Sequence, residues 1–129
     1  MCNKVLTSFR AKLTAFYPGP YVTEEEEQME GGAFDRMGAR LRTLDDFMLG
    51  RAEYVSTAAD VDAFRYGAPL CIPELDEHFG KQIRFRVVDT GSAFRGKGRE
   101  RLDICVATHA ESLNPVLNKS VLVVCCDAR

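Results

Sequence analysis

Apolar and polar residues alternate along three stretches of this chain, and a period of two is typical of β-strands that bury one face. The clearest stretch is residues 82–89, where three large apolar side chains fall on one face and two arginines on the other. Residues 101–107 alternate in the same way, and residues 5–17 do so in part. We predict a strand in each stretch, and we expect the strand at residues 5–17 to be closed by Pro18.

Three shorter segments also have the composition of strands. Tyr54–Thr57 is rich in β-prone residues, and Leu70–Ile72 is a short apolar run that we expect Pro73 to stop. Residues 120–126 form a continuous valine-rich run, which is typical of a strand that is fully buried. The polar residues 60–69, which include glycine and proline, predict a turn.

Helical signals are few. Thr43 has the position of an N-cap, because Asp46 follows three residues later ahead of an apolar run, and we expect this short helix to end at Gly50. Residues 110–118 predict one helical turn that Pro115 breaks. Five or six strands with one or two short helices predict a mainly β fold, either a compact barrel or a sandwich.

Length and composition narrow the class of protein. The chain has 129 residues, 46% of them hydrophobic, which is enough for one core, so we predict a single domain over residues 1–129. The formal net charge of -2 argues against a nucleic-acid partner. No apolar run approaches the roughly 20 residues of a membrane span. The start lacks a signal-peptide pattern, so we expect a chain that is cytoplasmic as synthesised and is then released or virion-associated.

Cysteines and charge clusters suggest no cofactor. The five cysteines are an odd number and lack the spacing of zinc ligands, so we expect reduced, mostly buried thiols and no metal site. The acidic run Glu24–Glu27 is expected to be a solvated loop. The basic residues between Arg84 and Arg101 belong either to solvated faces or to a positive rim around an anionic substrate.

Two predicted strands carry a more specific pattern. The first strand ends with Asp89, Thr90 and Gly91, and a basic residue and a glycine follow it. The second strand places Asp103 between two apolar residues. This arrangement resembles the three-aspartate domain, the module shared by membrane-bound lytic transglycosylase A and small bacterial muralytic and resuscitation-type proteins. The two aspartates are 14 residues apart, which is more than is usual in the family, and the insertion at residues 96–99 accounts for the difference.

The family's remaining aspartate matches Asp60, which opens the predicted turn seven residues before Gly67. The resemblance covers residues 12–124. Two further positions depart from the family: Ser92 replaces its usual second glycine, and Tyr66 stands where proline or leucine is common.

The resemblance implies a closed six-stranded double-psi β-barrel, whose groove accommodates polysaccharide in related barwin-like and expansin domains. It also implies a lytic transglycosylase that cleaves the glycan strand of peptidoglycan and leaves a 1,6-anhydro product without a cofactor. Asp103 matches the family's proposed catalytic acid/base. Asp89 and Asp60 would then stabilise positive charge on the sugar or orient the acid. The expected substrate contacts are Thr90, Gly91, Gly67 and Tyr66.

Glycan cleavage needs a carboxyl group that stays protonated near neutral pH. If the three aspartates converge, their mutual repulsion raises the pKa of at least one of them. The structural alternative is that Asp60 and Asp89 accept hydrogen bonds from turn amides, as Asp commonly does. The alternative function is a non-catalytic cell-wall-binding or structural module on the same barrel, for example a virion component that assembles into a larger particle.

Overall fold

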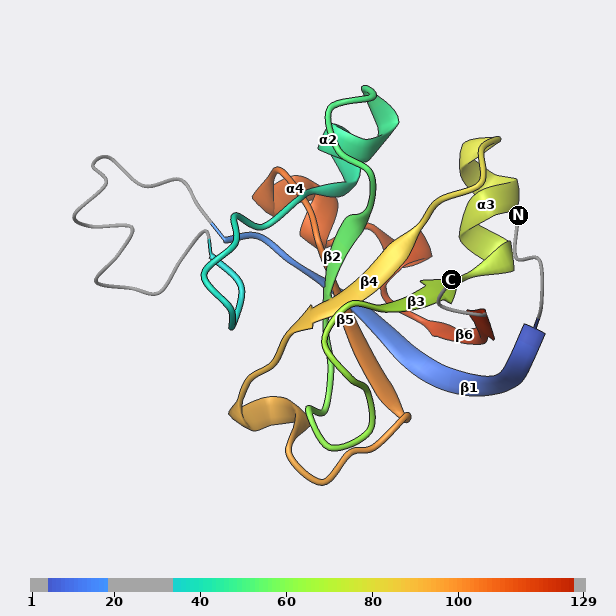
Figure 1. Ribbon diagram of the computed structural model, residues 1–129. Coiled ribbons are helices and arrows are strands. Elements are labelled where there is room, and N and C mark those ends of the chain that lie inside the picture. The colour runs from blue at the N-terminus through green and yellow to red at the C-terminus, as the bar shows by residue number, and fades with distance from the viewer. Residues whose placement is uncertain (1–4, 19–33, 127–129) are drawn as a thin grey trace.

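The computed structural model describes residues 5–18 and 34–126, and within them six strands close into a barrel (Figure 1). The expected solvated loop at Glu24–Glu27 lies outside these residues. The strands are β1 (Val5–Phe16), β2 (Val55–Ala58), β3 (Ala68–Cys71), β4 (Phe85–Asp89), β5 (Arg101–Cys105) and β6 (Ser120–Cys126).

The strand order around the barrel is β1-β5-β2-β4-β3-β6, and β6 pairs back onto β1. Two pairs run parallel, β1 with β5 and β2 with β4, and the others are antiparallel. Among the described strands, only β3 and β4 are neighbours in both the sequence and the sheet, so every other pair of consecutive strands is separated in the barrel. The predicted mainly β, six-stranded barrel is confirmed, and closure pairs both edges of each strand.

The predicted alternation decides which side chains fill the barrel. On β5, Leu102 and Ile104 are fully buried in the core, whereas Asp103 between them projects from the other face. The run at residues 120–126 also alternates, because Val121 and Val123 are fully buried while Leu122 is 36% exposed. The prediction that this run is buried throughout was wrong, since a strand of a closed barrel buries only its inner face unless another element covers the outside.

Helix α2 (Leu44–Met48) begins as predicted at Thr43. The Thr43 hydroxyl accepts the N–H of Asp46 at 3.0 Å, and the Asp46 carboxylate accepts the N–H of Thr43 at 3.3 Å. This capping box satisfies backbone donors that a helix leaves unpaired at its start. The buried side chains of Leu44 and Phe47 then attach the helix to the barrel core.

Helix α3 (Pro73–Phe79) was not predicted, because Pro73 was interpreted only as the end of a strand. Proline at the first helical position lacks an N–H that would be unpaired there anyway, so it also starts helices. Gly80 ends α3 with a φ of 67°. The strand predicted at residues 82–89 begins later, at Phe85, because the N–H of Ile83 donates to the Asp76 carboxylate of α3 at 2.9 Å.

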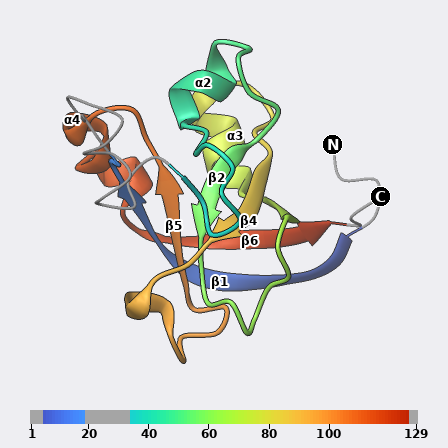
Figure 2. The same cartoon turned by 60° about the vertical axis from the view of Figure 1, so that its left-hand side comes forward.

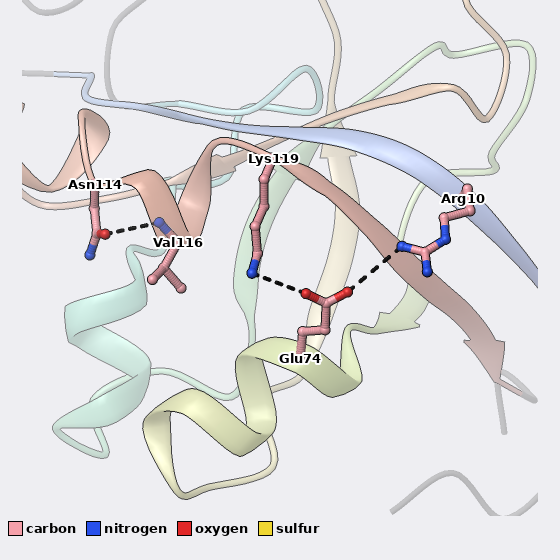
Figure 3. A network of polar contacts seen from close by, with 5 residues as sticks. All are labelled: Arg10, Glu74, Asn114, Val116 and Lys119. Carbon is pink, nitrogen blue, oxygen red and sulfur yellow. Dashed lines mark hydrogen bonds and ion pairs between the residues drawn. The ribbon is translucent and has the colours of Figure 1, made fainter.

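Glu74 of α3 bridges two other segments of the barrel (Figure 3). Its carboxylate lies 3.8 Å from Arg10 on β1 and 3.1 Å from Lys119, which precedes β6. The same view shows Asn114, whose side chain accepts the N–H of Val116 at 3.0 Å and caps the 3₁₀-helix η2 (Pro115–Leu117). Helix α4 (His109–Ser112) precedes η2. The predicted helical turn is present, but it ends before Pro115, and Pro115 begins η2 instead of breaking α4.

Helices α2 and α3 and two of the turns occupy different ends of the barrel (Figures 1 and 2). Helices α2 and α3 lie at one end. The turn after β2 and the loop after β4, which contains the 3₁₀-helix η1 (Ser92–Phe94), lie at the other. Within the described residues, every helix is too short and too polar to span a bilayer.

Candidate functional site

Asp103 and Asp89 lie in one row across three adjacent strands. In the strand ladder, Asp103 of β5 is opposite Ala58 of β2, and Ala58 is opposite Asp89 of β4. Opposite residues project from the same face, and the neighbours Leu102 and Ile104 belong to the core, so both carboxylates lie on the outer face of the barrel. Two strand spacings separate their backbones by about 10 Å.

A β-bulge in β4 brings Asp89 onto this face. Thr57 pairs with Val87 and the next residue, Ala58, pairs with Asp89, so Val88 is an extra residue in the ladder. Without that extra residue, strict alternation from the core residue Val87 would turn Asp89 into the barrel interior. The bulge is therefore the feature that places two carboxylates on one surface.

Asp103 is half-buried and poorly supported by hydrogen bonds. Burial raises the pKa of its carboxyl group, and the Thr14 hydroxyl and the Arg101 guanidinium partly oppose that shift. Thr14 is its ladder partner on β1, and the Thr14 hydroxyl also donates to the Leu102 carbonyl at 3.3 Å. In the part of the chain that the structure describes, the enclosed Oδ1 atom of Asp103 has no hydrogen-bond partner. This setting favours the protonated form, which is the form of a general acid.

Burial is also the main cause that raises the pKa of Asp89. The N–H of Thr90 lowers it, the charge of Asp35 raises it, and the Arg36 guanidinium lowers it. Neither Asp103 nor Asp89 is among the described groups that shift the other's pKa. The raised pKa values thus come from burial rather than from the expected repulsion among three converging aspartates.

Asp60 has the opposite environment. Its side chain is 4% exposed, and its carboxylate accepts the N–H of Gly98 at 2.9 Å and the N–H of Asp62 at 3.0 Å. These two bonds, with a further one from Gly96, lower the pKa of Asp60 although burial opposes them. Asp60 therefore anchors the loop at residues 96–99, the same loop that is longer than in the three-aspartate family.

A hollow of about 270 Å³ lies at this end of the barrel, between the turn after β2 and the loop after β4. Three of the expected site residues, Asp60, Thr90 and Gly91, meet around it. Gly91 has an extended backbone with φ of -173°, and a β-carbon there would make an ordinary 3.7 Å contact with Phe94, so the fold does not demand glycine. The full lining is Asp60, Val61, Asp62, Thr90, Gly91, Ser92 and Arg95.

Tyr66 and Gly67 lie outside the lining of this hollow. The Tyr66 hydroxyl donates to the Asp35 carboxylate at 2.6 Å, and this bond raises the pKa of Tyr66 to about 12. Gly67 has φ of +82°, which favours glycine, and its N–H donates to the Val87 carbonyl at 2.6 Å. Its own carbonyl accepts from Arg86 at 3.0 Å, so both residues make specific contacts within the chain.

Two residues that shift the pKa of Asp89 were not predicted from the sequence: the charge of Asp35 raises it, and the guanidinium of Arg36 lowers it. They belong to a short hairpin, residues 34–40, whose backbone reaches β4. The Asp35 and Gly38 of this segment are residues that favour a tight turn, so the turn had a local signal. Its contact with β4, about 50 residues later in the chain, had none.

Cys105 lies two residues beyond Asp103 on the same outer face but is fully buried. Burial first, and then the charges of Asp46 and Asp103, raise the pKa of its thiol to about 12, so it stays protonated and unreactive. Among the described residues, Cys105 and Cys125 are free thiols, as predicted. The prediction of mostly buried thiols was wrong for Cys71 and Cys125, which are partly exposed.

Among the described residues, no three His, Cys, Asp or Glu side chains are grouped so as to hold a metal ion. No family model matches this chain, and no curated protein matches it. The resemblance to the three-aspartate domain therefore rests on the residues quoted above. The barrel itself does not test that resemblance, because one fold serves many functions.

Proposed function

We propose that this chain is a peptidoglycan-directed lytic transglycosylase in which Asp103 is the single acid/base. The observation that carries the proposal is the state of this carboxyl group. It is half-buried on a rigid strand, its pKa is raised, and its Oδ1 atom has no hydrogen-bond partner within the described chain. Such a setting favours the protonated form, which is the form that cleavage of a glycosidic bond requires of the acid.

The proposed reaction needs one carboxyl group and no water. Protonated Asp103 gives its proton to the glycosidic oxygen while the bond from that oxygen to C1 of the muramic sugar breaks. The Asp103 carboxylate then takes the proton of the C6 hydroxyl as that oxygen bonds to C1, which closes the 1,6-anhydro ring. Asp103 is protonated again at the end of the cycle, so the reaction consumes no cofactor.

Asp89 and Asp60 have different parts in this proposal. Positive charge develops on the sugar ring as the bond to C1 breaks, and Asp89 lies on the same face to stabilise it. Asp60 takes no part in proton transfer, because its bonds to the N–H groups of Gly98 and Asp62 hold it ionised. The hollow lined by Thr90 and Gly91 is the proposed place for a sugar of the bound strand.

The proposal is tested by incubating purified protein with peptidoglycan sacculi and analysing the soluble products by mass spectrometry. We expect 1,6-anhydro-muropeptides from the wild-type protein and a loss of roughly 10²–10⁴-fold in Asp103→Asn, which keeps the size of the side chain. Glu77→Gln is the matched control, because it removes an exposed carboxylate on α3 at the helical end of the barrel. Circular dichroism of each variant checks that the fold is intact.

One observation favours the alternative function, a non-catalytic wall-binding or virion structural module. Asp60, one of the three aspartates of the pattern, has its carboxylate occupied by loop amides. Binding to sacculi without release of any anhydro product would overturn the enzymatic proposal in favour of this module. Failure to pellet with sacculi would overturn both.

A further inference from the structure

Residues 34–40 form a hairpin that an isolated β-bridge closes. The N–H of Asp35 donates to the Ala39 carbonyl at 2.7 Å. The Oδ1 atom of Asp35 accepts the N–H groups of Met37 and Ala39 at 2.8 and 3.0 Å. Asp35 is 6% exposed, so a nearly enclosed carboxylate organises the whole turn.

Two contacts hold this hairpin against the barrel beside the end of β4 (Figure 1). The Oδ2 atom of Asp35 accepts the Tyr66 hydroxyl at 2.6 Å, and the N–H of Arg36 donates to the Val88 carbonyl at 3.4 Å. Val88 is the bulge residue directly before Asp89. The hairpin is therefore attached where the outer row of carboxylates ends.

One nitrogen of the Arg36 guanidinium is the atom in this network that lacks a hydrogen-bond partner. The guanidinium lies 5.5 Å from the centroid of the Tyr66 ring, which holds it by a cation–π contact. Its Nη1 atom is enclosed and has no hydrogen-bond partner among the residues that the structure describes. Both oxygens of the nearby Asp35 carboxylate already accept other donors. A charged nitrogen that is enclosed without a partner costs free energy. The Arg36 side chain as a whole is only partly buried, so a rotation of its guanidinium would present this nitrogen to a bound anion and offset that cost.

Enclosed polar atoms without a hydrogen-bond partner also occur beside Asp103, at the other end of the row that Asp103 and Asp89 form. Within the described chain, the enclosed side-chain polar atoms without a partner are Arg36 Nη1, Arg101 Nε and Asp103 Oδ1. The guanidinium of Arg36 lowers the pKa of Asp89, and the guanidinium of Arg101 lowers the pKa of Asp103. Two carboxylates on one face would repel an anionic ligand, whereas a guanidinium at the end of the row attracts one. The planar fork of arginine matches a carboxylate group in particular.

We propose that Arg36 is a substrate-binding residue that pairs with a carboxylate group of the glycan strand at the Asp89 end of the row. This inference rests on the proposed function and adds one chemical feature of the substrate. The carboxylate belongs either to the lactyl group of the muramic sugar or to the stem peptide attached to it. Asp35 and Tyr66 are positioning residues, because they hold the hairpin that carries Arg36.

The test compares three soluble ligands of equal sugar number. They are glycan strands with stem peptides, strands from which an amidase has removed the peptides to leave free lactyl carboxylates, and neutral chitooligosaccharides. Dissociation constants are measured by calorimetry in the Asp103→Asn background, so that no ligand is cleaved. We expect at least one carboxylate-bearing strand to bind roughly ten-fold more tightly than the neutral ligand, which is the size expected of a charge-assisted pair.

Substitution of Arg36 should remove this preference and leave the affinity for the neutral ligand unchanged. Arg36→Gln is expected to bind all three ligands equally, and Arg36→Lys to keep part of the preference. Arg65→Gln is the matched control, since Arg65 is an exposed arginine directly before Tyr66 and its loss should change no affinity. Tyr66→Phe should weaken the binding of the carboxylate-bearing strands alone, because it loosens the hairpin that carries Arg36 and removes no contact with the glycan.

Each outcome separates the two levels of the proposal. If the protein with Arg36 intact bound charged and neutral ligands equally, the assignment of Arg36 would be overturned and glycan binding would remain. An equal loss of affinity for all three ligands in Arg36→Gln and Arg36→Lys would have the same meaning. Binding of none of the three ligands would overturn the proposed function together with it. Tighter binding of the amidase-treated strands identifies the lactyl carboxylate, and tighter binding of the peptide-bearing strands identifies the stem peptide.

Discussion

On β5, Asp103 projects from the outer face of the barrel, half-buried, with one oxygen that no described group bonds. At the end of the barrel, Asp60 is nearly enclosed as well, but backbone N–H groups of Gly98 and Asp62 bond both of its oxygens. Burial raises the pKa of Asp103, whereas hydrogen bonds lower that of Asp60. Burial alone therefore does not decide the protonation of a carboxyl group; the supply of donors does.

Two residues that one sequence pattern treats alike thus have environments that suit different tasks. A carboxyl group with few donors is suited to hold and transfer a proton, and one with several is suited to hold a loop. The loop that Asp60 holds, residues 96–99, follows η1 and leads into β5, the strand that carries Asp103. The structural aspartate thus supports the approach to the proposed catalytic one.

The largest expected effect comes from exchanging each aspartate for asparagine. Asp103→Asn should lower the release of anhydro-muropeptides by roughly 10²–10⁴-fold, because the transferable proton is lost. Asp60→Asn should lower it by less than about tenfold, since it only loosens a loop that Gly98 and Asp62 help to hold. Product release is measured by chromatography and mass spectrometry. If Asp60→Asn were as damaging as Asp103→Asn while still folded, Asp60 would have to act in the chemistry itself.

The pH dependence of stability should have opposite signs at the two positions. The pKa of Asp60 is lowered from 3.8, so its ionised form stabilises the fold above pH 3.8, and this contribution is lost as the pH falls through the lowered pKa. The pKa of Asp103 is raised from 3.8, so the folded state binds this proton more tightly, and stability falls as the pH rises from 3.8 through the raised pKa.

At pH 7 we therefore expect Asp60→Asn to lower Tm and Asp103→Asn to raise it. Both differences from the wild type should shrink on acidification, when the two carboxyl groups become protonated in the folded and unfolded states alike. Circular dichroism melts in a buffer series measure this, with Asp62→Asn as an exposed neighbouring control. A shift of the same sign for both variants at pH 7 would contradict the contrast between them.

A smaller effect is expected at the hairpin that carries Arg36. Tyr66→Phe removes the donor to the Asp35 carboxylate and should lower the free energy of unfolding by about 1 kcal/mol, the usual net contribution of such a bond. Urea denaturation measures it. Tyr54→Phe is the control, because no hydrogen bond of the Tyr54 hydroxyl is seen within the described residues. Equal losses in both variants would mean that the Tyr66 hydroxyl does not hold the hairpin.

The smallest effect is expected at the opposite, helical end of the barrel. Glu74→Gln removes ion pairs with Arg10 and Lys119, whose side chains are 66% and 46% exposed. Water and salt screen such pairs, so the free energy of unfolding should fall by about 0.2–1 kcal/mol, and the difference should vanish at high salt. Urea denaturation at two salt concentrations checks this, with Glu77→Gln as the control. A salt-independent loss would show that Glu74 acts through packing instead.

Much of the fold was predictable because its signals are local. Alternation identified the strands, and Thr43 with Asp46 identified the start of α2. The exceptions depended on contacts with distant segments. Strand β4 begins late because the Asp76 carboxylate of α3 accepts the N–H of Ile83, and Leu122 is 36% exposed because it projects from the outer face of the closed barrel.

The site was only partly predictable. The period of two correctly put Asp103 on the face away from the core. The same rule fails for Asp89, because the bulge at Val88 shifts the register between β2 and β4 by one residue. The hairpin with Asp35 and Arg36 could not be linked to Asp89 from the sequence, since that link is a contact between segments far apart in the chain.

By itself, the sequence determined where most strands and the cap at Thr43 form and that Asp103 lies on an outer face, because these depend on residues a few positions apart. Only the tertiary structure decided that Asp103 and Asp89 share a row and that Asp60 bonds Gly98, 38 residues away. Protonation follows from that arrangement, since burial and N–H donors are supplied by segments distant in sequence. Three aspartates that the sequence presents as equals therefore have different environments once the barrel closes: two lie in one row on the outer face, and the third holds a loop.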